Sequence, residues 1–77
     1  MTYALFERVV LARDVLEADL RSGDVGVVVE LYGGEGLEVE FMSASGDTRA
    51  VVTLDLSDVR KAHADDMLAV RPMRAAS

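Results

Sequence analysis

The chain has 77 residues, no cysteine and a formal net charge of −6. A chain of this length makes one small domain, and without cysteine it has no disulfide or cysteine-bound metal to support its core. The acidic balance opposes binding to nucleic acid, because phosphate backbones carry the same sign of charge. We expect a single domain over residues 1–72 and a frayed tail over residues 73–77.

The charge is distributed unevenly. Residues 1–59 carry four arginines and twelve acidic residues, a balance of −8, whereas residues 60–77 carry four basic and two acidic residues, a balance of +2, and the two sum to −6. The basic segment is too short for a polybasic arm. No stretch reaches the roughly 18 apolar residues of a membrane-spanning helix, and the first residues lack a secretory pattern. We therefore expect a cytoplasmic protein without membrane contact.

The first predicted strand is the β-branched run at residues 9–12. A long connection follows, and we expect its three apolar residues, Val15, Leu16 and Leu20, to cover one end of the core. A single helical turn over residues 15–20 is the alternative, because no longer periodic stretch is present.

The connection ends in turn chemistry. In Ser22-Gly23-Asp24, glycine tolerates positive φ and the aspartate side chain accepts a neighbouring backbone N–H. Gly26 follows at the start of the next strand, where glycine often marks a close backbone approach or a bend.

Residues 27–32 and 37–43 predict a hairpin. We expect Val27, Val29 and Leu31 to face the core, opposite Ser43, Phe41 and Val39. The other face would then carry Val28, Glu30 and Tyr32 opposite Met42, Glu40 and Glu38, and a one-residue slip would mix the two faces. The loop is Gly34-Glu35-Gly36, with Gly36 in the left-handed position of a bulge.

Residues 48–54 predict the next strand. The expected pairs are Leu37 with Leu54, Val39 with Val52, Phe41 with Ala50, and Glu40 with Val51. The loop is then Ser45-Gly46, a two-residue turn. Arg49 would be diagonal to Glu40 and would relieve the repulsion between Glu30 and Glu40.

The end of the chain is ambiguous. Ser57 is placed to cap a short helix over residues 58–64, or a 3-10 turn near residues 57–66. A tight turn at 65–67 and a last strand at 68–71, stopped by Pro72, would follow. These elements predict an all-β fold, a small five-stranded SH3-like barrel, since closure removes exposed sheet edges.

Two stretches resemble a family of small bacterial proteins, DUF4926, whose function is unassigned. They are Arg8-Val9-Val10-Leu11 and the run from Arg21 to Glu30, which follow the family's "V-V-L … L-x-x-G-D-x-G-x-V-V-E". Residues 37–41 correspond to its "Y-x-V-E-F", and we assign its late "D-L-x-x-V" to residues 66–70. The family is similar to SH3-like barrels, including KOW modules, so the resemblance implies a fold and no activity.

Candidate chemical sites are weak. Gly33-Gly34-Glu35-Gly36 lacks the lysine, the hydroxyl residue and the helix of a phosphate loop, so we interpret it as a turn. His63 with Asp65 and Asp66 would need further ligands to hold a metal, and we interpret it as a solvated loop. Glu30, Glu38 and Glu40 could pair for acid–base chemistry, but they alternate with apolar residues on a solvent face. We expect no catalytic, cofactor-binding or metal-binding residues.

The candidate partner-binding residues share the outer sheet face or the connection over 13–24. They are Val28, Glu30, Tyr32, Glu38, Glu40, Met42, Val51, Leu16 and Leu20. The N-terminal segment, with Tyr3, Leu5 and Phe6, could instead cover that face or make a contact between two copies of the chain. We therefore expect a non-enzymatic protein-interaction module or accessory subunit. The alternatives are a KOW-like binder of nucleic acid or the ribosome, and an acidic, antitoxin-like partner of a basic protein.

Overall fold

The computed structural model describes residues 2–33, 35–42 and 48–63. Within them lie five strands and two short 3-10 helices. The elements in chain order are β1 (Arg8–Leu11), η1 (Leu16–Ala18), β2 (Val25–Tyr32), β3 (Gly36–Met42), β4 (Thr48–Asp55), η2 (Leu56–Asp58) and β5 (Val59–Lys61).

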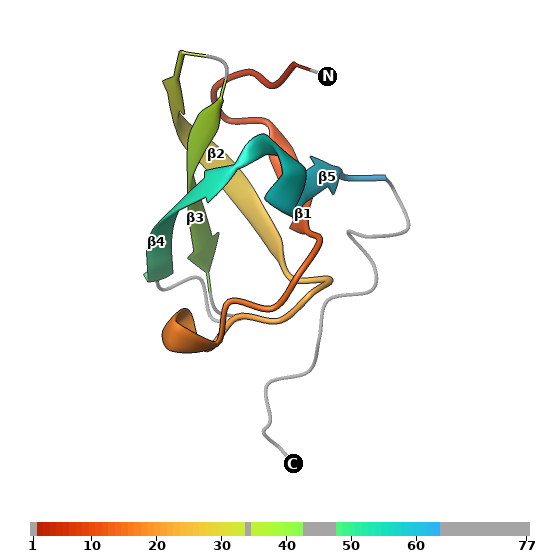
Figure 1. Ribbon diagram of the computed structural model, residues 1–77, viewed down its shortest axis with the longest axis vertical. Helices are drawn as coiled ribbons and strands as arrows, with labels where there is room; N and C mark the ends of the chain where they lie inside the picture. The colour runs from red at the N-terminus through yellow and green to blue at the C-terminus, as the bar shows by residue number, and fades with distance from the viewer. Residues whose placement is uncertain (1, 34, 43–47, 64–77) are drawn as a thin grey trace.

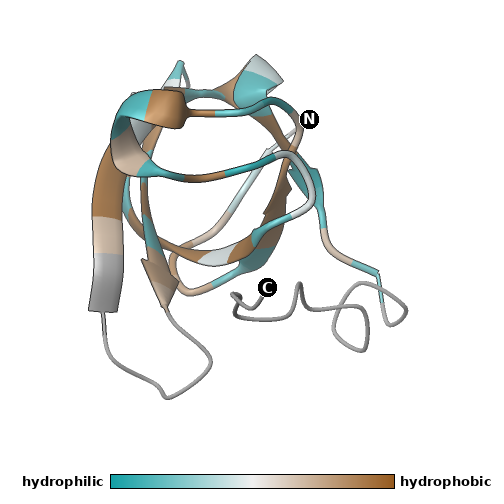
Figure 2. Cartoon of the chain, turned by 90° about the horizontal axis from the view of Figure 1, so that it is seen from below, coloured by the Kyte–Doolittle hydropathy of each residue, from teal (hydrophilic) through white to brown (hydrophobic). Residues whose placement is uncertain are grey.

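All five strands belong to one sheet with the order β4-β3-β2-β1-β5, and each described pairing is antiparallel. The sheet curls around one interior (Figures 1 and 2), and η2 leads directly from β4 at one edge of the sheet to β5 at the other. This arrangement confirms the all-β class with five strands. The finer assignment to the SH3-like barrels stays a prediction.

The pairing of β3 with β4 has the predicted register as far as Phe41, and it shifts by one residue at Met42, which pairs with Thr48. Leu37 lies opposite Leu54, Val39 opposite Val52, and Phe41 opposite Ala50. Leu37, Val39 and Phe41 are all buried, because a period of two turns these three side chains to the same face of β3. The predicted loop at Ser45-Gly46 lies outside the described residues, as does the predicted role of the Arg49 side chain.

The predicted register between β2 and β3 is wrong. Val28 lies opposite Val39, and Glu30 lies opposite Glu38, so one residue of β2, Val29, is left over as a β-bulge between them. The bulge reverses the alternation along β2. Val28 consequently points into the core, where it is fully buried, instead of onto the outer face.

The hairpin loop lies one residue earlier than predicted, independently of the bulge. Tyr32 pairs with Gly36, which makes Gly36 the first residue of β3. The left-handed conformation, predicted for Gly36, is found at Gly33 with φ 64°, and Gly36 is not among the glycines with positive φ. The prediction that Gly36 needs positive φ is therefore wrong.

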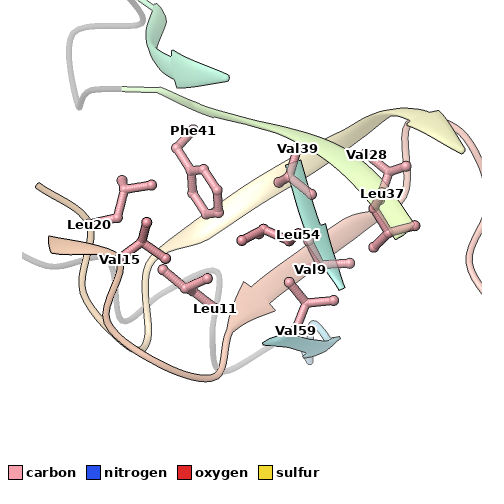
Figure 3. Close-up of a cluster of buried hydrophobic side chains, with 10 residues drawn as sticks. All are labelled: Val9, Leu11, Val15, Leu20, Val28, Leu37, Val39, Phe41, Leu54 and Val59. Atoms are coloured by element: carbon pink, nitrogen blue, oxygen red, sulfur yellow. The ribbon is translucent and has the colours of Figure 1, made fainter. Parts of the chain in front are cut away.

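The core is one apolar cluster inside the curled sheet. Figure 3 shows its ten members: Val9, Leu11, Val15, Leu20, Val28, Leu37, Val39, Phe41, Leu54 and Val59. Among the described residues no polar or charged side chain is buried, so no side chain in the core needs a buried hydrogen-bond partner.

Gly26 allows the closest approach within this core. It pairs with Phe41, and a Cβ added to Gly26 would lie 2.6 Å from Cγ1 of Val39 and 2.8 Å from Cε1 of Phe41. The Phe41 ring therefore occupies the space that a side chain at position 26 would need. The predicted close backbone approach at Gly26 is confirmed.

The connection from β1 to β2 closes one end of the core, as expected. Val15 and Leu20 exchange two backbone hydrogen bonds across η1, of 2.9 and 3.0 Å, and both side chains are buried. Leu16, which starts η1, is 65% exposed, so the prediction that it covers the core is wrong.

At residues 56–61 the alternative of a 3-10 turn is confirmed, whereas the helix is not. The turn is the 3-10 helix Leu56–Asp58, at the start of the predicted range, and Ser57 lies inside it and does not cap it. The chain then becomes extended again because Val59 is buried and β5 pairs with β1. A helix over residues 58–64 is thereby excluded. The strand predicted at 68–71, the turn at 65–67 and the tail at 73–77 lie outside the described residues.

Candidate functional site

The outer face of β2, β3 and β4 combines exposed apolar side chains with carboxylates. Three large side chains there are about half exposed: Tyr32 (48%), Met42 (48%) and Val51 (49%). The carboxylates are those of Glu30, Glu38 and Glu40. Along β3, glutamates alternate with apolar residues. We call the six residues Glu30, Tyr32, Glu38, Glu40, Met42 and Val51 the outer face.

The register arranges the outer face in rows across the sheet. One row runs from Glu30 through Glu38 to Thr53. The next runs from Val27 through Glu40 to Val51. Carboxylates therefore dominate the end near the β2–β3 loop, and apolar side chains dominate toward Met42. Val27 was predicted to face the core, and the bulge at Val29 is the reason that it does not.

A hydrogen bond orders the acidic end. The Tyr32 hydroxyl donates to Oε1 of Glu38. This bond to Glu38 is the main cause that raises the pKa of Tyr32 above its ordinary value of 10.0, with partial burial and the negative charges of Glu38 and Glu30 adding to it. The phenol ring is thereby held beside two carboxylates.

The N-terminal segment leaves the outer face open. Tyr3 packs against the core, and its hydroxyl donates to the carbonyl oxygen of Val59 at 3.4 Å. Leu5 (47%) and Phe6 (73%) remain exposed. The alternative in which Tyr3, Leu5 and Phe6 cover Tyr32, Met42 and Val51 is therefore wrong.

Lys61 fixes the N-terminal segment. Its ammonium group donates to Oε2 of Glu7 and, at 2.6 Å, to the carbonyl oxygen of Thr2, and it lies 4.6 Å from the centre of the Tyr3 ring. The hydrogen bond from Lys61 is the main cause that lowers the pKa of Glu7. Glu7 Oε1 also accepts the backbone N–H of Ala4, so one carboxylate joins two parts of the chain.

Two predicted contact residues are excluded from an exposed surface. Val28 and Leu20 are 0% and 1% exposed and belong to the core cluster. Leu16 is exposed, but it lies on η1 and outside the sheet. The structure therefore places Glu30, Tyr32, Glu38, Glu40, Met42 and Val51 on one face and separates the other three from it.

The Gly-Asp turn before β2 is used structurally. Gly23 has φ 99°, the Asp24 carboxylate accepts the N–H of Arg21 at 3.0 Å, and Asp14 accepts the N–H of Ser22 at 2.8 Å. This confirms the predicted turn chemistry. The residues that suggested a KOW-like nucleic-acid site thus hold their own loop together.

Two further features bear on the kind of site. Among the described residues no three histidine, cysteine or acidic side chains come together to hold a metal, and Asp65 and Asp66 lie outside those residues. No helix in the described part of the chain has the length and apolar character to cross a membrane.

Comparison with known proteins gives one match. The family described as "Domain of unknown function (DUF4926)" matches residues 5–61, whereas no curated protein and no solved structure matches the chain. The match ends before residues 66–70, so the late motif was assigned to the wrong place. Its spacing is met inside the match by Asp55-Leu56-Ser57-Asp58-Val59, which form the end of β4, η2 and the start of β5. All five strands lie within the matched region, and the chain belongs to this DUF4926 family.

Proposed function

We propose that the chain is a small protein-interaction module, an accessory subunit without catalytic activity of its own, that contacts its partner through the outer face. The observation that supports this is the group of half-exposed Tyr32, Met42 and Val51 on one side of the sheet. Tyrosine and methionine are enriched where proteins meet, and three such side chains on one rigid face could be buried together.

The rest of the proposal follows from composition and topology. The order β4-β3-β2-β1-β5 and the 3-10 turn before β5 support placing the domain among the SH3-like barrels. The net charge of −6 favours a protein partner over nucleic acid. We infer that the domain acts in the cytoplasm.

The test compares three variants that each add one lysine at an exposed apolar position. Val51→Lys alters the outer face and places an opposite charge across from Glu40, which favours the sheet. Leu16→Lys alters the connection between β1 and β2. Leu5→Lys is the matched control, because Leu5 (47%) is as exposed as Val51 (49%).

The variants are used as affinity baits in a nuclease-treated lysate of the source organism. The proposal requires a stoichiometric protein that wild type, Leu16→Lys and Leu5→Lys retain and that Val51→Lys loses. Loss with Leu16→Lys alone would move the contact to the β1–β2 connection. Retention by all three variants would overturn the outer face as the contact surface.

A further inference from the structure

The outer face carries a pair of like charges that face each other. Glu30 lies directly opposite Glu38 in the register of β2 and β3. Side chains opposite one another in an antiparallel pair have Cβ atoms about 5 Å apart, and like charges there oppose folding. Among residues 2–33, 35–42 and 48–63, neither carboxylate has an ion-pair partner.

The third strand adds no basic residue to this row. The residue of β4 opposite Glu38 is Thr53, which carries no charge. The row across β2, β3 and β4 therefore carries two carboxylates and no basic residue.

An aromatic ring stands beside this charge. Tyr32 follows Glu30 by two residues on the same face of β2, it is 48% exposed, and its hydroxyl is held by Glu38. Its register partner is Gly36, which has no side chain that could cover the ring. A planar guanidinium fits such a place, because it can bridge two carboxylates while it stacks on an aromatic face.

We propose that the outer face binds a protein segment through an arginine held between Glu30 and Glu38 against the Tyr32 ring, with an apolar neighbour of that arginine on Met42 and Val51. This rests on the proposed function and specifies the partner's chemistry. Val51 lies one row from the carboxylate pair and Met42 two rows away, so an extended partner would carry its apolar residues two and four positions from the arginine.

A second copy of the chain does not fit this surface. A two-fold contact centred on these carboxylates would bring Glu30, Glu38 and Glu40 of one copy against the same residues of the other. Facing like charges in an interface oppose association. The charge complementarity favours a basic, apolar partner instead.

The probe is a capped nonapeptide, Leu-Thr-Leu-Thr-Arg-Thr-Leu-Thr-Leu, which reads the same in both chain directions. Two matched peptides carry lysine or glutamine at the centre. The chain has two tyrosines and no tryptophan, so in the Tyr3→Phe background the tyrosine fluorescence comes from Tyr32 alone and reports binding.

The expected result is that the arginine peptide binds about tenfold more tightly than the lysine peptide, since lysine makes no bidentate or stacked contact. Glu30→Gln should weaken arginine-peptide binding about threefold to fivefold. The same variant should raise the melting temperature by about 1–5 °C, because it removes the opposed charges. Opposite effects on binding and stability are the signature of this site.

Glu17→Gln, on η1, is the control with the same change in net charge, and it should leave binding unchanged. Equal affinities for the arginine and lysine peptides, or equal losses in the Glu30 and Glu17 variants, would overturn the inference by showing diffuse attraction only. If none of the peptides binds while Val51→Lys still loses a cellular partner, the guanidinium site fails and the proposed function stands. If Val51→Lys retains every partner, the proposed function fails by itself.

Discussion

Arg13 and Asp58 lie 45 positions apart in the sequence and form a two-point ion pair. Nε of Arg13 is 2.8 Å from Oδ1 of Asp58, and Nη2 is 3.5 Å from Oδ2. Oδ2 also accepts the backbone N–H of Asp55 at 2.9 Å, and the Asp58 carbonyl accepts the N–H of Ala12 at 2.7 Å. One residue of η2 thereby joins the end of β1 to the end of β4.

These bonds predict that Asp58 contributes more to the free energy of unfolding than a residue near the surface usually does. Asp58→Ala should lower the free energy of unfolding by about 1–2 kcal/mol, because it removes both the ion pair and the bond to the Asp55 N–H. Arg13 is 53% exposed in its side chain, so Arg13→Gln should lower the free energy of unfolding much less than Asp58→Ala does. Urea unfolding of both single variants and the double variant measures their coupling, and strictly additive losses would show that the pair contributes nothing.

Acid should weaken the fold through two carboxylates. The hydrogen bond from Arg13 lowers the pKa of Asp58 below 3.8, and that from Lys61 lowers the pKa of Glu7 below 4.5. A carboxyl with a lowered pKa in the folded state stabilises the fold above its unfolded pKa and loses that contribution as the pH falls through the folded pKa. The melting temperature should therefore be level from pH 7 to about 5.5 and fall between about pH 5 and 3.

The Glu7 share of this acid response can be removed by Lys61→Met. That variant should have a lower melting temperature than wild type at pH 7. Its melting temperature should also fall less on acidification. Amide exchange at Ala4, whose N–H bonds to Glu7 at 3.0 Å, should quicken in the variant. An acid response as steep as that of wild type would show that the pair with Lys61 does not perturb Glu7.

Two glycines next to the core should differ in how much the same substitution destabilises the fold. Gly26→Ala should lower the free energy of unfolding by about 1–3 kcal/mol, because the new Cβ would lie 2.6 Å from Val39 and 2.8 Å from Phe41. Gly36→Ala should change it by less than about 0.5 kcal/mol, since the nearest atom to its Cβ is the Leu54 carbonyl oxygen at 3.5 Å. Equal decreases in the free energy of unfolding, measured with urea, would contradict the conclusion that the Phe41 ring fills the space beside Gly26.

Tyr32 should ionise late. In the Tyr3→Phe background, ultraviolet absorbance should show the pKa of Tyr32 above 10.0, and Glu38→Gln should move it downward, because the hydrogen bond to Glu38 is the main cause of the shift. Glu17→Gln is the control and should leave the titration where it is. A Tyr32 titration that Glu38→Gln does not move would show that the phenol and this carboxylate are not joined in solution.

The second hairpin could be predicted from the sequence because β3 alternates strictly. Leu37, Val39 and Phe41 are separated by glutamates, so only one register places all three with Leu54, Val52 and Ala50. In β2, by contrast, Val27, Val28 and Val29 are consecutive, and a run of identical apolar residues does not state which of them faces inward. The predicted register assumed a regular strand and therefore placed Val28 on the wrong face.

The bulge in β2 also limited how much of the candidate site could be predicted from the sequence. Glu30, Tyr32, Glu38, Glu40, Met42 and Val51 could be assigned to one face, because they follow the bulge or lie on regular strands. Val27 was missed because it precedes the bulge. β5 was missed because Val59-Arg60-Lys61 is short and polar, and only its pairing with β1 makes it a strand. The spacing of Asp55 and Asp58 within "D-L-x-x-V" was the signal that could have located it.

The bulge at Val29 has a consequence for how the length of this chain can vary. Without Val29, strand β2 would alternate regularly, with Gly26, Val28 and Leu31 on one side and Val27, Glu30 and Tyr32 on the other. Every side chain would keep its present face, and the lost residue would remove only the local bend and extra twist that a bulge imparts. Position 29 is therefore a place where relatives can differ in length by one residue. Such a difference would alter the curvature of the sheet and leave the same side chains on each face.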